Sequence, residues 1–510
     1  MKNVDDRVIH NPVIPGFHPD PSAIRVGSRY LIATSTFEWF PGVALHSSTD
    51  LRTWQAIGGA LDRPEQLDLR GVPDSGGIWA PALSYHDGLY WLVFTVVRTM
   101  TGAYKDLDNH LVTATDPAGP WSDPVYLNSS GFDPSLFHAS DGRRYLVNVN
   151  WDHRADRFSF GGVLLQEYDH DRRGLVGEPE VIFASDELME GSHLFERDGW
   201  FYLILAEGGT GFNHGIRLAR SRELHGPYET DPQPLLTSRD DPRLPIQKAG
   251  HGQLITTPDG EHYIVHLGSR PVAGATEPRS PLGRETFLQR VRWDADGWLR
   301  LADGGHHPYV EVPGVEAPQE PAVPEEPFRG PEWVSLRGPV AADLDSRPGW
   351  LRLRGGESLD SRFQQSMLAR RLTSLHCTAE VTVEADPRHF TEMAGLVVYY
   401  NTTGYHYLAV THHEALGRVV GVISKSPAGI VEHRWHPADP GPLRLRAEFD
   451  QLRLVLSAGD GHRWEADLDA LSDEIGPPLR FTGTMIGVCV QDLARRRFTA
   501  DFTHFEFRAE

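Results

Sequence analysis

Acidic residues recur at matching places in short motifs along the N-terminal part of the chain. Asp20 and Asp133 each begin an Asp-Pro-Ser sequence, and Glu190 begins a related Glu-Gly-Ser sequence. One such aspartate is well explained as a turn residue that caps backbone N–H groups. Three acids at equivalent positions of a repeat are not, because like charges gathered together cost stability unless they are used. Two carboxyl groups in different protonation states provide the acid and the base of glycoside hydrolysis, and a third can keep one of them protonated.

A metal site is the rival interpretation of the same acids. His251 begins a later copy of the motif, His-Gly-Gln, so an imidazole would join the carboxylates. Oxygen-rich sites suit Ca²⁺, and His251 alone could bind a divalent cation. The residue types therefore leave two chemistries open, which are acid–base catalysis and the binding of an ion such as Ca²⁺ near His251.

The acids belong to a five-fold internal repeat. In each copy a turn glycine precedes an apolar strand that contains a tyrosine. The five tyrosines are Tyr30, Tyr90, Tyr145, Tyr202 and Tyr263, and successive ones are 60, 55, 57 and 61 residues apart. The acid motif or its counterpart starts 10 to 12 residues before each tyrosine. Five repeats, each long enough for four strands, predict a five-bladed β-propeller whose innermost strands converge on one axis. The first positions of the motif, at residues 20, 80, 133, 190 and 251, would then meet at one mouth.

The chain divides after the repeats. The stretch from Pro308 to Pro331 contains seven prolines, its two ends included, with acidic residues among them, and this composition favours an extended linker. Short β-branched and aromatic runs bounded by Gly, Asp and Pro dominate both halves, which predicts an all-β fold. We expect a five-bladed propeller over residues 1–312, a Pro/Glu-rich linker over 313–327 and a jelly-roll-like β-sandwich over 328–510.

Composition and charge exclude several classes of partner. The chain has 49 Lys and Arg against 70 Asp and Glu, and its formal charge of −21 repels phosphate backbones and anionic lipid. No apolar run approaches the ~18 residues of a membrane span, and the first residues lack the apolar core of a signal peptide. Two cysteines, Cys377 and Cys489, are too few for a disulfide framework. We therefore expect a cytoplasmic protein with buried reduced thiols, no nucleic-acid partner and no membrane contact.

Six segments, in order along the chain, resemble glycoside hydrolase family 43, and together they resemble its β-xylosidase branch. The segments are Asn11–Ser22, Ser35–Gly42, Gly76–Pro81, Gly131–Phe137, Glu190–His193 and Pro281–Thr286. That branch pairs a five-bladed propeller with a C-terminal β-sandwich, so the resemblance covers nearly the whole chain. It implies an exo-acting, inverting β-D-xylosidase that trims xylo-oligosaccharides from the non-reducing end, a step in xylan degradation.

The resemblance also implies a role for each acid. Asp20 is expected to be the general base that activates the attacking water, and Glu190 the general acid that protonates the leaving oxygen. Asp133 is expected to raise the pKa of the acid and to align it. Because the family inverts the anomeric configuration, the carboxyl groups of Asp20 and Glu190 should lie roughly 6.5–9.5 Å apart, with room for water.

Five further residues are expected around the sugar. Phe37 and Trp79 would form apolar walls, and Arg284 would bind sugar hydroxyls or balance the charge of the acids. His251 and Phe481 would also contact the substrate. His251 resembles the axial histidine that binds a divalent cation in parts of the family. The segment around Phe481 resembles a loop of the second domain that closes one side of the pocket, so that only a chain end can enter. For Arg284 the alternative is a surface ion pair with Glu285.

Other functions stay open at this point. L-arabinofuranose and D-xylopyranose present similar hydroxyl arrangements, so the alternative activity is that of an α-L-arabinofuranosidase. More distant alternatives are a non-catalytic carbohydrate-binding protein and a calcium-stabilised scaffold. The acid–base chemistry requires no cofactor, and the family's habit of assembly implies a homo-oligomer, either a dimer or a tetramer.

Two motifs suggest no chemistry by their spacing. Gly208–Gly211 lacks the last glycine of a dinucleotide-binding fingerprint, and the adjacent pair His306–His307 has no further ligand at metal-binding spacing.

Overall fold

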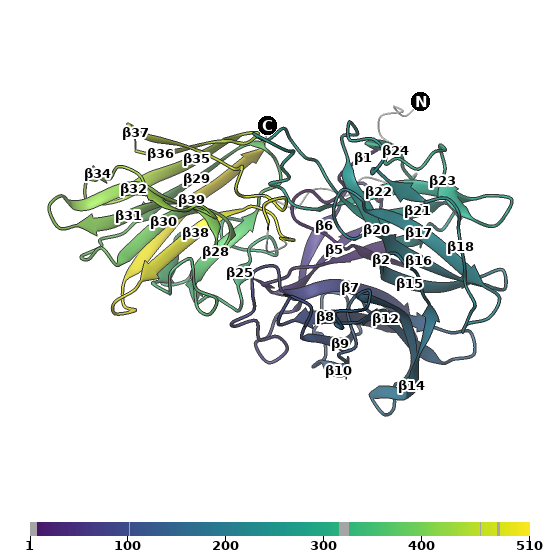
Figure 1. Ribbon diagram of the computed structural model, residues 1–510. Helices are drawn as coiled ribbons and strands as arrows, with labels where there is room; N and C mark the ends of the chain where they lie inside the picture. The colour runs from purple at the N-terminus through teal and green to yellow at the C-terminus, as the bar shows by residue number, and fades with distance from the viewer. Residues whose placement is uncertain (1–7, 101, 316–325, 460, 477–479, 510) are drawn as a thin grey trace.

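The computed structural model describes residues 8–100, 102–315, 326–459, 461–476 and 480–509. The regular structure of these ranges consists of 39 β-strands (Figure 1), so the all-β prediction is confirmed. Nothing in the described ranges forms a helix that could cross a membrane.

Five antiparallel sheets form the blades of a propeller, and within each blade the strands follow chain order. The first blade consists of β2 (Ser22–Val26), β3 (Arg29–Thr34), β5 (Gly42–Ser48) and β6 (Gln55–Leu61). The second consists of β7 (Gly77–His86), β8 (Leu89–Val97), β9 (Leu107–Ala114) and β10 (Val125–Asn128). The third consists of β11 (Ser135–His138), β12 (Arg144–Trp151), β13 (Phe160–Asp169) and β14 (Gly174–Phe183).

The remaining two blades have the same plan. The fourth consists of β15 (Met189–Arg197), β16 (Trp200–Glu207) and β17 (Gly215–Ser221), with β18 (Glu229–Thr230) and β19 (Leu236–Thr237) both paired to β17. The fifth consists of β20 (Gln247–Thr256), β21 (His262–Ser269), β22 (Glu285–Trp293) and β23 (Leu299–Leu301). The first strands contact one another in a closed ring, since β2 touches β7 and β20, and β11 and β15 complete the circle. The predicted five-bladed propeller is therefore confirmed.

The repeat of the sequence corresponds to one strand of each blade. Each tyrosine of the repeat lies in the second strand of its blade, and its side chain is buried. These residues are Tyr30, Tyr90, Tyr145, Tyr202 and Tyr263. The period thus arises because each blade must bury the same face of its second strand against its neighbours.

A short strand pair outside the blades joins the start of the chain to the end of the propeller. Strand β1 (Val8–His10) runs antiparallel to β24 (Glu311–Pro313). Beside this pair the Asn11 amide donates to the carbonyl oxygen of Leu288 at 2.8 Å, across 277 residues of sequence, and accepts from the Leu288 N–H at 2.8 Å. These contacts hold the N-terminal segment against the fifth blade and close the ring.

Residues at the inner ends of the blades adopt left-handed backbone conformations. Asp20, Asp133 and His251 have φ of 54°, 53° and 43°. This conformation is uncommon for residues other than glycine. Asp20 and Asp133 lie just before β2 and β11, and His251 lies within β20 where its pairing with β21 shifts register. In the fourth blade the left-handed residue is Gly191, with φ of 55°, directly after Glu190. A Cβ atom on Gly191 would lie 2.8 Å from Nε2 of His251, so the glycine lets the imidazole pack against the backbone.

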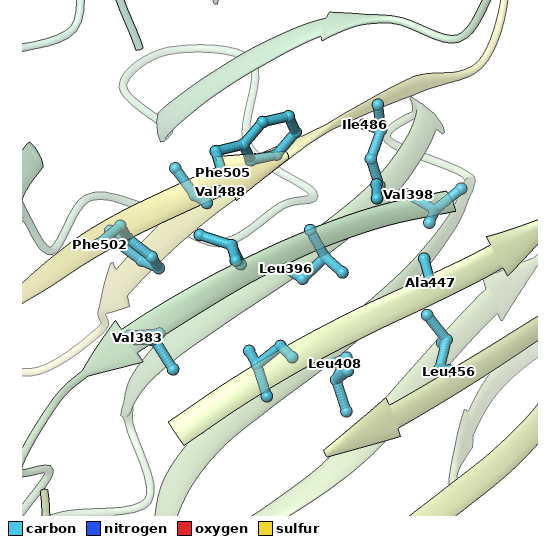
Figure 2. Close-up of a cluster of buried hydrophobic side chains, with 14 of the residues drawn as sticks. Val383, Leu396, Val398, Leu408, Ala447, Leu456, Ile486, Val488, Phe502 and Phe505 are labelled. Carbon is cyan, nitrogen blue, oxygen red and sulfur yellow. The ribbon is translucent and has the colours of Figure 1, made fainter. Parts of the chain in front are cut away.

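The C-terminal domain is a sandwich of two sheets. One sheet contains, in order, β26 (Ala342–Asp343), β27 (Leu351–Arg354), β39 (Thr499–Ala509), β29 (His376–Glu384), β35 (Leu443–Asp450), β36 (Arg453–Ala458) and β37 (His462–Asp467). The other contains β28 (Ser366–Arg371), β38 (Met485–Asp492), β30 (Glu392–Asn401), β31 (Gly404–His413), β32 (Gly417–Ser426) and β33 (Gly429–Glu432), with β34 (His436–Pro437) paired to β32. Buried side chains from both sheets interdigitate, including Leu396 and Leu408 from one and Val383 and Phe502 from the other (Figure 2).

The two domains share strand pairing and a buried ion cluster. Strand β4 (Trp39–Phe40) of the propeller pairs with β25 (Ser335–Leu336) of the second domain, and Trp39 is a fully buried core residue. Lys248 of β20 reaches Asp473 at 2.9 Å and Glu474 at 2.6 Å, and all three side chains are buried. The predicted boundaries at residues 312 and 328 stay a prediction, because most of the predicted linker over 313–327 lies outside the described residues.

Replacing Gly191 with alanine should destabilise the protein more than the same change at Gly177. Both residues have left-handed backbones, with φ of 55° and 72°, but a Cβ at Gly177 would meet nothing within 4 Å. We expect Gly177→Ala to lower the free energy of unfolding by about 1 kcal/mol through backbone strain. Gly191→Ala should lower it by about 1–3 kcal/mol more, because the methyl group overpacks His251. Urea unfolding of both variants measures the difference, and equal losses would contradict the contact with His251.

Candidate active site

Eleven residues line one pocket where the inner ends of the blades meet the sandwich. All eight residues predicted for the site are among them, and they are Asp20, Phe37, Trp79, Asp133, Glu190, His251, Arg284 and Phe481. Seven come from the propeller, and Phe481 comes from the loop before β38 of the sandwich. Residues up to 461 positions apart in the chain therefore share one cavity.

Asp20 is held through both of its carboxylate oxygens. The hydroxyl of Ser35 donates to Oδ2 at 2.6 Å, and the same hydroxyl accepts from the N–H of Ala80 at 2.8 Å. Arg284 Nη1 donates to Oδ1 at 3.3 Å, and His251 Nδ1 lies 3.7 Å from that oxygen. These contacts fix the direction of the carboxylate at the wall of the pocket, where it can take a proton from a bound water.

Asp133 is tied to the strand that carries Glu190. The N–H of Gly191 donates to Asp133 Oδ2 at 2.9 Å, and Gly191 follows Glu190 directly in β15. Asp133 is buried, whereas Glu190 keeps part of its surface open to the pocket. The hydrogen bond through the backbone positions Glu190 relative to the other two acids.

The environment separates the protonation states of the acids. Burial, and next the negative charge of Asp20, raise the pKa of Glu190 to about 7, while Lys105 and Arg284 act in the opposite direction. Burial, followed by the charges of Glu190 and Asp20, also raises the pKa of Asp133 well above its ordinary value. The interaction between Asp133 and Glu190 is mutual, because the charge of Glu190 is among the causes that raise the pKa of Asp133, and the expected role of Asp133 toward Glu190 stays a prediction. An acid that is partly protonated near neutral pH is what general acid catalysis needs.

Three aromatic rings form the apolar wall of the pocket. The ring centroids of Phe37 and Phe481 lie 6.0 Å apart, and that of Trp79 lies 5.4 Å from Phe481 and 6.5 Å from Phe37. Trp79 meets both phenylalanines edge-on, the favoured geometry of aromatic pairs. The wall combines two blades of the propeller with the sandwich, and it offers faces on which the C–H groups of a sugar can pack.

Arg284 connects the acids to the second domain. Its Nη1 donates to Thr210 Oγ1 at 2.5 Å as well as to Asp20, and its Nη2 donates to the carbonyl oxygen of Phe481 at 3.1 Å. The guanidinium also lies over the Phe481 ring, 5.3 Å from its centroid. Arg284 is buried, so it is the positive charge that balances Asp20 inside the pocket.

The alternative prediction for Arg284, a surface ion pair with Glu285, is wrong. Glu285 forms its ion pair with Arg270, with nitrogen–oxygen distances of 2.7 and 2.8 Å. It also accepts from the N–H of Gly16 at 2.8 Å. Adjacent residues of an extended chain point to opposite sides, so Arg284 faces the pocket while Glu285 faces away from it.

Groups that could bind a metal ion lie in two places. His251 is buried in the pocket, and burial lowers its pKa, which favours the neutral imidazole. Within the described ranges, the one group of three metal-ligating side chains is instead Asp240 with His306 and His307. There the two imidazoles already pair with the two oxygens of Asp240 at 2.8 and 2.7 Å. The pair His306–His307 thus gains a third group from a residue far away in the sequence.

Sequence analysis missed three residues of the pocket, namely Phe132, Thr210 and His214. Phe132 directly precedes Asp133, and its ring lies 5.7 Å from that of Trp79. Thr210 lies within the Gly208–Gly211 motif that was set aside, and His214 ends the same turn. The signal that could have found Thr210 is the glycine-rich turn itself, which here brings a hydroxyl close to Arg284 rather than to a phosphate.

Two family profiles together match almost all of the chain. The profile described as Glycosyl hydrolases family 43 matches residues 9–299. The profile described as Beta xylosidase C-terminal Concanavalin A-like domain matches residues 325–508. The expected sandwich therefore belongs to the concanavalin A-like type.

Curated relatives extend over the whole chain. It is 41% identical to "Xylosidase/arabinosidase 43B" of Humicola insolens, with 98% of this chain and 97% of that protein covered. It is also 41% identical to "Beta-xylosidase" of Bacillus subtilis, with coverages of 98% and 99%. A third relative, 35% identical over 100% of this chain and 96% of the other, is "Non-reducing end alpha-L-arabinofuranosidase BoGH43B" of Bacteroides ovatus.

The whole fold also matches a solved structure. The crystal structure of xylan beta-1,4-xylosidase from Bacillus halodurans C-125 superposes with a TM-score of 0.95 at 46% identity, covering 98% of this chain and 100% of the other. The propeller, the sandwich and their relative placement are thus shared with that enzyme. The profile over the propeller, the full-length relatives and this superposition agree, and the chain belongs to glycoside hydrolase family 43.

Proposed function

We propose that the protein is an exo-acting, inverting β-D-xylosidase that releases xylose from the non-reducing end of short xylo-oligosaccharides. The observation that carries the proposal is the pocket that brings Asp20 and Glu190 together under a wall completed by Phe481. A pocket with a wall from the second domain favours the end of a chain over its middle. The printed names of the relatives support a pentose as the sugar.

The catalytic step follows from the surroundings of the acids. Asp20 takes a proton from water, whose oxygen attacks the anomeric carbon from one face of the sugar. Glu190 gives its proton to the glycosidic oxygen as that bond breaks on the other face, so the configuration inverts. Asp133 holds the backbone beside Glu190, and Arg284 balances the charge of Asp20. The separation of roughly 6.5–9.5 Å between the two carboxyl groups remains a prediction.

Hydrolysis of an α-L-arabinofuranoside is the alternative activity, and relatives with both activities in their names support it. Steady-state assays of the purified protein with aryl β-D-xylopyranoside and aryl α-L-arabinofuranoside rank the two by kcat/KM. We expect the xyloside to be preferred and Asp20→Ala to abolish turnover of both. A folded wild-type protein that turns over neither substrate would point instead to a carbohydrate-binding protein.

The effect of removing the Glu190 carboxyl group on kcat should depend on the leaving group of the substrate. If Glu190 protonates the leaving oxygen, Glu190→Ala should lower kcat on xylobiose by about 10²–10⁴-fold. The effect on an aryl xyloside with a good leaving group should be much smaller, because that oxygen needs little protonation. Glu196 lies on the same strand β15 with its side chain outside the pocket, so Glu196→Ala serves as the control. Equal losses on both substrates would contradict the role of Glu190.

The pH dependence should show the raised pKa of Glu190. The group must be protonated to act as an acid, and its pKa is raised to about 7. Activity on xylobiose should therefore be retained below pH 7 and decline above it, with an alkaline limb of kcat/KM near 7. An aryl substrate with a good leaving group should lose this limb. A limb of the same position and depth for both substrates would assign it to another group.

The residues around His251 can be compared with the ligands that a divalent cation requires. Ca²⁺ takes six to eight oxygen ligands, whereas His251 offers a nitrogen and the nearby Asp20 already bonds to Ser35 and Arg284. These residues fit Ca²⁺ poorly, and no catalytic step passes through an ion. Activity after exhaustive chelation, compared with activity after Ca²⁺ is restored, measures the dependence.

Assembly and location are also proposed. We expect a homo-oligomer, and the sandwich edge strand β33 supports it, because Ile430 and Val431 there are 55% and 56% exposed. Light scattering with size-exclusion chromatography gives the oligomeric state. Within the described residues Cys377 and Cys489 are buried and belong to no disulfide, which supports a reducing compartment, and we propose the cytoplasm, which cell fractionation tests.

A further inference from the structure

Ser75 occupies a fully buried position in the loop between β6 and β7. Its backbone is left-handed, with φ of 62°, so the loop turns sharply just before the strand that carries Trp79. The residue does not line the pocket. It lies directly behind the aromatic wall, where it contacts all of the segments that form it.

Each polar atom of Ser75 holds a different part of that wall. The Ser75 N–H donates to Oε2 of Glu38 at 3.0 Å, and Glu38 follows Phe37 in the chain. The Ser75 carbonyl oxygen accepts from the indole Nε1 of Trp79 at 2.8 Å. The Ser75 hydroxyl oxygen accepts from the N–H of Phe481 at 3.0 Å, across 406 residues of sequence. One residue thus touches the segments of all three rings.

Arg337 of the sandwich binds the same loop through hydrogen bonds. Arg337 is fully buried, and it donates from Nε to the carbonyl oxygen of Val72 at 2.9 Å and from Nη2 to Asp74 at 2.7 Å. The N–H of Arg337 donates to the carbonyl oxygen of Glu38 at 2.8 Å. The loop on which Ser75 lies is therefore clamped between the domains, so its hydroxyl has one fixed place from which to hold Phe481.

We propose that Ser75 is a positioning residue, which keeps the ring of Phe481 packed against Phe37 and Trp79 and so makes sugar binding depend on the docking of the sandwich. The proposal deepens the proposed glycosidase function and rests on it. A buried backbone N–H is costly to leave without a partner. Without the hydroxyl, the N–H of Phe481 loses its acceptor on the propeller, while the hydrogen bond from Arg284 to the carbonyl oxygen of Phe481 remains.

The test compares Ser75→Ala with Ser335→Ala. Ser335 is also buried near the domain boundary, but its hydroxyl donates to the carbonyl oxygen of Gly338 at 2.7 Å and touches no residue of the pocket. We expect Ser75→Ala to lower kcat/KM for the aryl xyloside about tenfold to hundredfold, the range expected when a buried donor loses its partner. Most of the loss should appear in KM, because the wall contacts substrate and transition state alike. Ser335→Ala should leave both constants unchanged.

A double-mutant cycle with Phe481→Ala separates positioning from general damage. If Ser75 acts through the Phe481 ring, Ser75→Ala added to Phe481→Ala should change KM by less than about threefold. Losses that multiply, or a kcat/KM unchanged by Ser75→Ala alone, overturn the proposal. Absence of turnover by the wild-type protein contradicts the proposed function instead.

Discussion

Three carboxyl groups sharing one buried pocket place the strongest constraint on this molecule. Like charges in a medium of low dielectric constant repel one another strongly, so the site tolerates them only with protons or cations nearby. Both solutions are present, since burial raises the pKa of Glu190 and of Asp133, which favours their protonated forms, and Arg284 pairs with Asp20. Arg284 also donates to the backbone of Phe481. The charge balance of the propeller and the docking of the sandwich therefore depend on the same guanidinium group.

The domain interface is suited to hold a fixed position. Lys248 with Asp473 and Glu474, and Arg337 with Asp74, are ion pairs taken out of water between the two domains. Removing one partner from a buried pair leaves an uncompensated charge and costs several kcal/mol. A hinge motion that separated the domains would break these pairs together. These pairs therefore hold the sandwich in the position in which its residue Phe481 lines the pocket.

The sequence predicted the parts of the site that repeat and missed those that do not. Asp20, Asp133 and Glu190 were found because the inner end of each blade is built from the same local motif, and that motif has a period. Phe481 was found only through its family resemblance, since no local pattern tells that a sandwich loop meets the propeller axis. The sign of Thr210 was a glycine-rich turn that carries no catalytic pattern, and Ser75 gave no sign in the sequence. Their importance lies in hydrogen bonds to residues 74 and 406 positions away, which only the folded chain brings together.

The closure of the propeller ring also sets the order in which parts of the chain can fold during synthesis. Asn11 bonds to Leu288 and β1 pairs with β24, so this early segment of the chain has to wait for the fifth blade. Contacts of such long sequence separation form late, because the intervening loop must first be closed. Until then the inner strand β2 of the first blade remains without the neighbour that β20 provides. Synthesis of the chain as far as β24 thus precedes the moment at which the propeller is complete.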